Sequence, residues 1–591
     1  MRLILFLFLF VPTILLAQDD LFAKEYYKNG DFEKALVEYK KLYAKSRSNI
    51  GYIKQIIDIH QQLEQYKEVE DFLLKIIGRT KYPAFYVTLG HNYQLQNNPE
   101  KANENYSVAI NSLLVNANNA YSVARAFQDY SLLDQAISTY EKAMDLKPQL
   151  NLKLPLAQLY GEKGNIEKMM LNYIDFAESN PVSLNNVKRA LNSFVSEDGN
   201  NNSNIILRKL LIKKIQQEPN VLWNELLGWL FVQQKDFSKA FAQEKAINAR
   251  KQEGLDRIMN LGKIAEKEKE FETAKSIFSY VIENAQDVDT KLMAFYDLLQ
   301  IETKEASRSS YEDLQNKYLE LFDTYGTFAQ TLDLQISYAH FLAFYMNKTG
   351  AATTFLENTL KLPLNDLQKA EIKFELADIL VLEEEFNKAL IYYTQIQRNL
   401  KNSEISQKAR FKVAKASYYK GDFKWAESQL KILKSSTSQL IANDALDLKL
   451  LISDNKYEDS LQIALKRYAK ADLLAFQNRN DEAITLLEFI LEEHKTEPIM
   501  PQALYKQGKL LEIKKQFENA ANNYQQIIEN YREGILIDNA IYSLAELYLY
   551  HLNAPEKAKE LYKELIFNHA DSIYFVEARQ QYRKLRGDAI N

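Results

Sequence analysis

The chain contains no cysteine. This absence excludes disulfides, thiolate metal sites, cysteine nucleophiles and a lipid anchor on a cysteine after a signal sequence. Glycine and proline are scarce, with 16 and 11 residues among 591. Their scarcity disfavours a turn-rich sandwich or barrel and favours helices. Beyond the N-terminal residues, no stretch is apolar enough to cross a membrane.

No catalytic motif is present either. The sequence lacks HExxH, GxGxxG, GxxxxGK[ST] and GxSxG, and its six histidines are scattered along the chain. His91 falls on a first-helix face, where we expect a solvated surface side chain. The triplet Arg586-Gly587-Asp588 is expected to end the last helix through Gly587. The sequence therefore predicts no enzyme, no catalytic residue, no metal and no cofactor.

Residues 1–17 have the pattern of a secretory signal peptide. Arg2 is followed by a run that is apolar apart from Pro12 and Thr13, and Ala17 can precede a cleavage site. An uncleaved anchor is the alternative. Removal of Arg2 with the signal moves the net charge from −5 to −6, which gives no general attraction to nucleic acid. We expect an exported protein without a membrane span or lipid anchor.

Small residues recur at a fixed interval of 33 or 34 residues, and a bulky residue follows each one four positions later. A repeat of about 34 residues built as two helices is typical of a solenoid. In one unit, Gly90 and Ala102 are expected to let two helices approach closely, with Tyr106 filling the space beside them. The small residues are Ala35, Val69, Ala102, Ala136 and Met169.

This pattern resembles the tetratricopeptide repeat (TPR). The resemblance implies an all-α solenoid, a right-handed superhelix of about 14 helical hairpins, which binds other proteins. Further along the chain the intervals lengthen to 37 or 38 residues, from Ala351 through Ala389 to Ala426 and from Ala483 through Ala520 to Ala558.

Irregular intervals divide the expected array. A degenerate pair is expected around 291–322, and an extra helix over Gln439–Ser453 is expected to cap or bend the solenoid. The polar run 196–204 is the expected internal boundary. The predicted domains are a signal peptide at 1–17, an N-terminal TPR array at 18–195, a central array with degenerate repeats at 205–435, and a C-terminal long-period array with a cap at 436–591.

The C-terminal repeats resemble those of periplasmic TPR proteins that serve outer-membrane assembly and Tol–Pal systems. The run Tyr418–Asn455 resembles exported TPR proteins of Bacteroidetes. These resemblances imply a periplasmic location, with association to the outer membrane through partners. The expected partners are envelope proteins or their peptide segments, and nucleic acid is not among them.

The concave face of a TPR array is formed by first helices, and residues three before and one after the small residue should point there. Aromatic side chains beside charges are suitable anchors for a peptide. The predicted partner-binding residues are Tyr121, Arg125, Phe374, Asp378, Phe411, Lys415, Tyr505, Lys509, Tyr542 and Glu546.

The predicted function is a non-catalytic protein–protein interaction scaffold of the bacterial periplasm, acting in cell-envelope or outer-membrane assembly. A holdase chaperone for outer-membrane proteins is one alternative. An accessory subunit of a cell-wall glycan enzyme is the other. TPR repeats determine the shape of a surface far better than its ligand, so the sequence does not name the partner.

Overall fold

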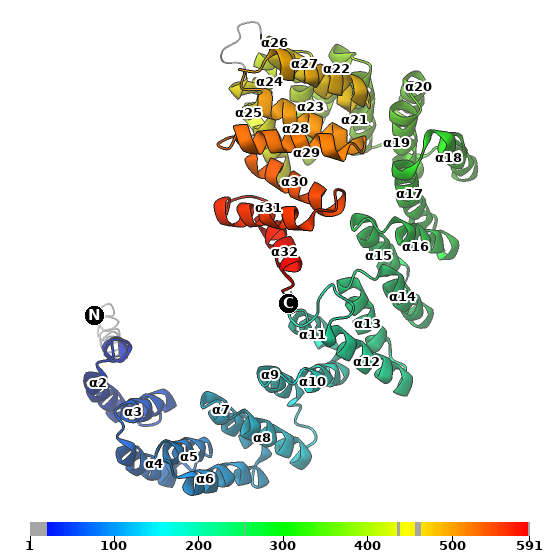
Figure 1. The fold of residues 1–591 in the computed structure, drawn as a ribbon. Helices are drawn as coiled ribbons and strands as arrows, with labels where there is room; N and C mark the ends of the chain where they lie inside the picture. Colours follow the sequence, from blue (N-terminus) through cyan, green and yellow to red (C-terminus); the bar gives the residue numbers. More distant parts are fainter. Residues whose placement is uncertain (1–19, 253, 434–437, 456–461, 589–591) are drawn as a thin grey trace, which may run out of the picture. The chain divides into compact units, whose positions relative to one another are not determined.

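The computed structural model describes residues 20–252, 254–433, 438–455 and 462–588. Within these ranges the regular structure is helical and no strand occurs (Figure 1), which confirms the all-α prediction. No helix among the described residues is long and apolar enough to cross a membrane. The predicted signal peptide at 1–17 lies outside the described residues.

The chain divides into two compact units, Met1–Leu230 and Phe231–Asn591. The division falls inside α13 (Val221–Gln233). After a helical stretch at residues 20–28, the α-helices of the first unit are α2 (Phe32–Lys45), α3 (Ile50–Gln62), α4 (Tyr66–Thr80), α5 (Ala84–Leu95), α6 (Pro99–Asn111), α7 (Ala120–Asp129), α8 (Leu133–Leu146), α9 (Lys153–Glu162), α10 (Ile166–Ser179), α11 (Leu184–Leu191) and α12 (Asn202–Gln217).

The second unit contains the longer repeats. A π-helical turn, η6 (Phe341–Tyr345), follows α19. The α-helices of the second unit are α14 (Phe237–Lys251), α15 (Asp256–Lys267), α16 (Phe271–Asn284), α17 (Val288–Glu305), α18 (Tyr311–Tyr325), α19 (Leu332–His340), α20 (Thr349–Thr359), α21 (Asp366–Leu382), α22 (Phe386–Asn399), α23 (Glu404–Tyr419), α24 (Phe423–Leu433), α25 (Gln439–Asp454), α26 (Ile463–Phe476), α27 (Asn480–Glu493), α28 (Met500–Ile513), α29 (Phe517–Asn530), α30 (Ile537–Tyr550), α31 (Pro555–Asn568) and α32 (Phe575–Arg586).

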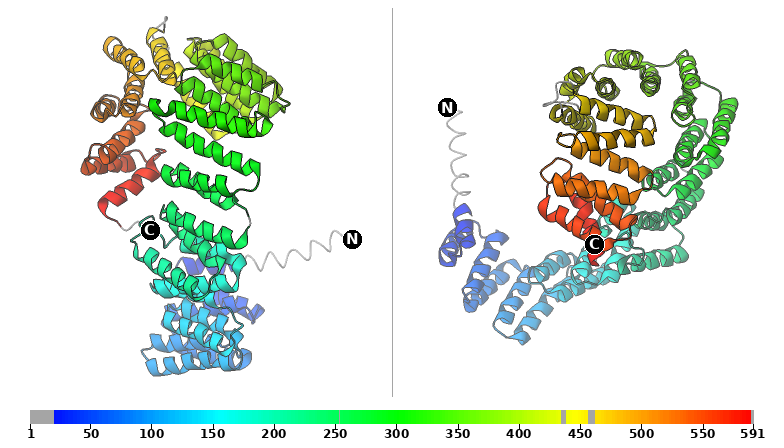
Figure 2. Two further views of the ribbon diagram at one scale, coloured as in Figure 1. Left: turned by 90° about the vertical axis from the view of Figure 1, so that its right-hand side faces the viewer. Right: turned by 45° about the horizontal axis from the view of Figure 1, so that its top comes forward.

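Helices pack in the order of the sequence within each unit. In the first unit α5 pairs with α6, α7 with α8 and α9 with α10. In the second unit the pairs include α15 with α16, α21 with α22, α28 with α29 and α30 with α31, and each pair packs on the next (Figure 2). This stacking of helix pairs is the solenoid that the repeat interval predicts. We call the two members of a pair its first helix and its second helix.

The crossing of first and second helices depends on a small residue opposite an aromatic ring. A Cβ atom added at Gly90 would lie 2.6 Å from Cδ1 of Tyr106 and 2.9 Å from the carbonyl oxygen of Ala102. The same crossing recurs in the second unit, where a Cβ atom at Gly508 would lie 2.6 Å from Cε1 of Tyr524. The predicted role of Gly90 and Ala102 is confirmed.

The turn between the paired helices has a fixed form. Its central residue takes the left-handed conformation, and the amide of the next residue donates to a carbonyl five residues back, as Gln65 does to His60 at 2.8 Å and Gln516 to Leu511 at 2.9 Å. This is the Schellman ending of a helix. Glycine fills the central position at Gly30, Gly164 and Gly421, whereas side chains occupy it at Glu64, Asn97, Ser131, Lys269, Glu384, Asn478 and Lys515.

One sequence prediction needs adjustment in the second unit, and another is confirmed. Ala352, not Ala351, is the small residue buried in α20, so the interval from there to Ala389 is 37 residues. The extra helix expected over Gln439–Ser453 is present as α25. It lies outside the regular order, because α26 packs directly on α23.

The run 196–204 is more structured than a simple polar loop. Its last three residues begin α12, and Asn204 is fully buried. The Asn204 amide donates to the carbonyl oxygens of Ser196 and Asp198, both at 2.7 Å. The connection between α11 and α12 is therefore held by a buried hydrogen-bond network. The division into arrays at 18–195, 205–435 and 436–591 stays a prediction.

At the end of the chain, Gly587 adopts φ of 82° and its amide bonds to the carbonyl oxygens of Arg583 and Lys584. The expected role of Gly587 in ending α32 is confirmed.

We expect Gly90→Ala to lower the free energy of unfolding of the first unit by about 1–3 kcal/mol, because the added methyl group overpacks the crossing with Tyr106. Gly78→Ala is the matched control, since α4 leaves nothing within 4 Å of its Cβ position. Urea denaturation followed by circular dichroism measures both. Equal midpoints for the two variants would contradict the role assigned to the crossing.

Substitutions at the left-handed position of this turn should change the stability in opposite directions at Lys515 and Gly421. Lys515→Gly should raise stability by a few tenths to about 1 kcal/mol, because a left-handed backbone costs a residue with a Cβ atom about 1–2 kcal/mol. Gly421→Ala should lower stability by about 1 kcal/mol for the same reason. Thermal unfolding of the two variants tests this, and shifts of the same sign would be inconsistent with the shared turn geometry.

Candidate protein-binding surface

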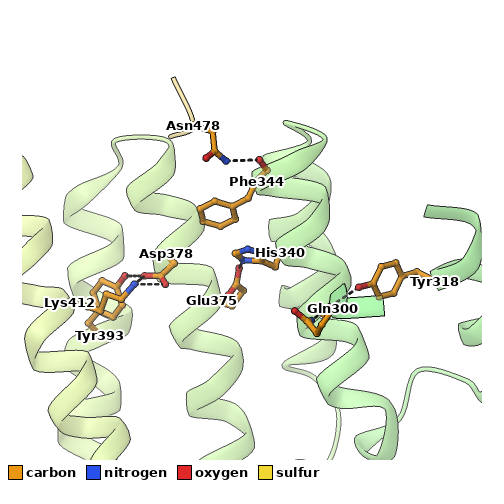
Figure 3. A network of polar contacts seen from close by, with 10 residues as sticks. Gln300, Tyr318, His340, Phe344, Glu375, Asp378, Tyr393, Lys412 and Asn478 are labelled. Atoms are coloured by element: carbon orange, nitrogen blue, oxygen red, sulfur yellow. Dashed lines mark hydrogen bonds and ion pairs between the residues drawn. The ribbon is translucent and has the colours of Figure 1, made fainter. Parts of the chain in front are cut away.

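The first helices of successive pairs are joined by polar side chains. In the second unit, Lys412 of α23 donates to Asp378 of α21 at 2.7 Å, and Lys506 of α28 donates to Asp472 of α26 at 2.5 Å. His340 of α19 lies 2.9 Å from a carboxylate oxygen of Glu375 of α21 (Figure 3). We call the surface formed by these first helices, away from the second helices, the inner face. Its polar pairs fix one repeat against the next.

Carboxylates near the crossing also hold buried tyrosines of the second helices. Tyr393 donates to Asp378, and Tyr562 donates to Glu546 at 2.5 Å. Burial raises the pKa of both tyrosines above the ordinary value, so each phenol remains a donor across the physiological range. Asp378 and Glu546 were predicted to meet a partner. In the structure both are bonded within the chain.

The predicted residues of the first unit lie at the surface. Tyr121 is 51% exposed and sits edge-on to Tyr140, with the ring centroids 6.3 Å apart. Arg125, one turn further along α7, is exposed. These two side chains share one face of α7 and leave an accessible aromatic group beside a positive charge.

The predicted residues of α21 and α23 are mostly half-buried. Phe374 packs edge-on against Tyr393, and the ammonium of Lys412 lies 5.4 Å from its ring centroid. Phe411 packs against the core of this part of the unit. Lys415 lies 5.7 Å from the Tyr419 ring, and no carboxylate of the described residues is within ion-pair distance of it. Burial lowers the pKa of Lys415.

The predicted residues of α28 and α30 make ring contacts inside the solenoid. Tyr505 lies 5.6 Å from the Tyr524 ring, and Lys509 sits over both rings while pairing with Glu512 at 3.0 Å. Tyr542 stacks on Tyr574 at 4.4 Å, and burial raises the pKa of Tyr542 to about 12. The TPR register thus identifies residues near the inner face, but many of them pack between repeats.

A hollow that the sequence analysis missed opens between α15, α17 and α19. Its volume is about 320 Å³. Its apolar lining residues include Leu292, Met293 and Leu334; Met293 is 47% exposed, whereas the two leucines are buried. Three aspartates and one lysine belong to the same lining. The lining residues are Lys263, Asp289, Leu292, Met293, Tyr296, Asp297, Gln330, Asp333 and Leu334.

The charge of the hollow is predominantly negative. Lys263 is 3.5 Å from Asp297, and burial nevertheless raises the pKa of Asp297. Burial, and then the charge of Asp333, raises the pKa of Glu371 on α21. Raised carboxyl pKa values are the consequence of burial and of like charges that are not fully compensated. A cation placed in the hollow would be stabilised.

The register explains why the hollow was missed. Counting one residue after Gly262 reaches Lys263, which does line it. The aspartates of α17 and α19 belong to the degenerate repeats, where no small residue at the usual interval marks the register. Only the helix pairing itself places Asp297 and Asp333 beside Lys263.

His91 differs from the expected solvated side chain. Its ring stacks on Tyr130 with the centroids 3.9 Å apart, and burial lowers its pKa. On the same face, Lys54 of α3 pairs with Asp129 of α7 at 2.5 Å. The expectation for His91 was wrong because the stacking of α5 against α7 brings Tyr130 over the ring.

No set of histidine and acidic side chains suited to a metal ion occurs among the residues that the structure describes. The comparisons with known proteins concern the repeats. Residues 468–535, which span most of α26 together with α27, α28 and α29, match the family described as tetratricopeptide repeat. No curated protein matches the chain significantly.

Two solved structures align with most of the chain. The complex of Naa15/Naa10 bound to HypK-THB is 11% identical, with 97% of this chain and 94% of that chain covered and a TM-score of 0.29. The APC/C hetero-tetramer Cut9-Hcn1 is 12% identical, with 97% of each chain covered and a TM-score of 0.24. Similarity at these TM-scores carries no argument about this chain.

Lowering the pH should reduce the stability of the first unit, because His91 has a lowered pKa in the folded chain. A pKa lowered by folding means that the unfolded chain binds more protons between the lowered value and about 6.5. The free energy of unfolding should therefore fall as the pH decreases through that interval. His91→Phe keeps a ring against Tyr130 and should lose part of this pH dependence, by a few tenths to about 1 kcal/mol. Denaturation at pH 7.5 and 5.5 measures the difference, and identical slopes would refute it.

The small-residue crossings, the repeated turns and the ordered stacking of helix pairs within each unit agree with the family match. Residues 468–535 match the tetratricopeptide repeat family, and the described helix pairs form an all-α solenoid of the TPR type.

Proposed function

We propose that the protein is a non-catalytic scaffold that binds other proteins through its inner face, in the periplasm of a bacterium of the Bacteroidetes type. Its process is cell-envelope or outer-membrane assembly. The apolar N-terminal residues 1–17 and the resemblance of the C-terminal repeats to periplasmic TPR proteins support this location. The cysteine-free sequence supports a form without a lipid anchor on cysteine.

The observation that carries the binding role is the hollow between α15, α17 and α19. Its lining combines the apolar side chains of Leu292, Met293 and Leu334 with the carboxylates of Asp289, Asp297 and Asp333. A partner segment that carries a lysine or arginine next to an apolar residue complements both parts. We infer that such a basic, partly apolar segment of an envelope protein docks there.

Affinity purification from cross-linked cells, followed by mass spectrometry, identifies the partner. Reproducible recovery of one or a few envelope proteins in fixed stoichiometry supports the scaffold. Broad and weak binding of many unfolded outer-membrane chains, with suppression of their aggregation, would favour a holdase instead. Turnover of cell-wall glycan by the purified protein would favour a role with a glycan enzyme.

Neutralising the hollow should weaken the partner's binding. The triple variant Asp289→Asn, Asp297→Asn, Asp333→Asn should raise the Kd about tenfold at low salt, because the attraction of three carboxylates for the partner's cation contributes on the order of 1–3 kcal/mol. The effect should shrink at 0.5 M salt, which screens exposed charges. Isothermal titration with the recovered partner measures both.

The matched control removes the same number of carboxylates from a second helix. Glu312, Glu320 and Asp323 of α18 are exposed, and their amide variants should leave the Kd unchanged. An equal loss of affinity in both triple variants would indicate nonspecific charge attraction and would contradict docking in the hollow.

A further inference from the structure

One turn of the second unit contacts repeats that are not its neighbours. Repeats of a solenoid ordinarily touch only the repeat before and the repeat after. The turn Phe476–Arg479, between α26 and α27, reaches back over 134 and 95 residues of sequence. The side-chain amide of Asn478 donates to the carbonyl oxygen of Phe344 at 3.3 Å (Figure 3). The side-chain amide of Gln477 donates to the carbonyl oxygen of Leu382 at 2.9 Å. The ends of α21 and η6 are thus tied to the end of α26.

The aromatic side chain of this turn lies over the inner face. The Phe476 ring packs edge-on against Phe344 at 5.6 Å and lies 6.1 Å from the Tyr419 ring. The ammonium of Lys412 is 5.9 Å from the Phe476 centroid and 5.4 Å from the Phe374 centroid. Phe476 therefore lies beside the place where Lys412 meets Phe374 and Asp378.

An ion pair and a hydrogen bond also join α26 and its following turn to the turn after α21. Lys470 of α26 pairs with Glu384 at 2.7 Å, and the Gln477 amide also reaches that carboxylate at 3.3 Å. The hydrogen bond from Lys470 holds the pKa of Glu384 below its ordinary value. Because Glu384 is the left-handed residue of the α21–α22 turn, the contact joins one interhelical turn to another.

The carbonyl oxygen that accepts the hydrogen bond from Asn478 belongs to a π-helical turn. Phe344 lies within η6, and its ring stacks on His340 at 4.3 Å, which in turn meets Glu375. Single π-turns occur frequently at functional sites. Although the extra helix α25 stands between them in the sequence, α26 packs directly against α23.

We propose that Phe476–Arg479 is an autoinhibitory latch. While it is closed, it restricts access to Phe374, Asp378 and Lys412, which are partly exposed, and a partner protein reaches them fully only after it opens. Asn478 is exposed and Phe476 and Gln477 are only partly buried, which is typical of contacts that open locally while the fold persists. Use of this face by a partner rests on the proposed function, whereas the opening of the latch is independent of it.

The absence of cysteine gives a clean background for the test. Gly350→Cys and Thr485→Cys place two spin labels on α20 and α27 at exposed positions, and Gly350 has nothing within 4 Å of a Cβ atom. Double electron–electron resonance should give one narrow distance for the closed latch. Adding Gln477→Ala and Asn478→Ala should lengthen and broaden that distribution. An unchanged distribution would overturn the latch.

Access to the inner face is measured separately. In Phe374→Cys, the single thiol lies in the covered area, and its rate of reaction with 5,5′-dithiobis(2-nitrobenzoic acid) reports opening. We expect Gln477→Ala with Asn478→Ala to raise this rate at least tenfold, with Phe476→Ala as a second way to open the latch. Circular dichroism confirms that each variant retains its helices.

Phe489→Ala is the matched control for the ring, because Phe489 belongs to the same helix pair, is 40% exposed and meets Arg467 instead of the latch. It should leave both the label distance and the thiol rate unchanged. A thiol rate that does not respond to the latch variants would overturn the proposal, whether or not an envelope partner is found.

Discussion

The solenoid depends on one steric constraint, which is the close crossing of two helices at a small residue that faces an aromatic ring. At Gly90 and Gly508 even one methyl group would collide with the ring of Tyr106 or Tyr524. Close approach buries the rings and leaves their hydroxyl groups at the edge of the crossing, where Tyr524 donates to Glu512. The crossing therefore sets both the packing of a repeat and the position of its polar groups.

The polar groups decide which parts of the inner face are open. Asp378 and Glu546 are engaged by tyrosines of their own repeats, and Phe476 lies beside Lys412. Between α15, α17 and α19 the aspartates have a single lysine among them, and the apolar side chain of Met293 is 47% exposed. One solenoid thus presents a closed segment and an open segment within the same unit, and the open one has the chemistry of a docking site.

The sequence predicted what repeats at a fixed interval. The helix pairs, the crossing at Gly90 and the extra helix α25 follow from spacing and from local preferences, because each is determined within about 40 residues of chain. The hollow was missed because degenerate repeats interrupt the register around Asp297. The stacking of His91 and the contact of Asn478 with Phe344 depend on how separate repeats meet, and no local pattern encodes that.

Cross-linking mass spectrometry of the protein with its captured partner tests the central claim most directly, because lysines mark both surfaces of the solenoid. The account predicts that links to the partner start from first-helix lysines such as Lys263 and Lys373. Links that start mainly from second-helix lysines such as Lys245 and Lys388 would contradict binding through the inner face.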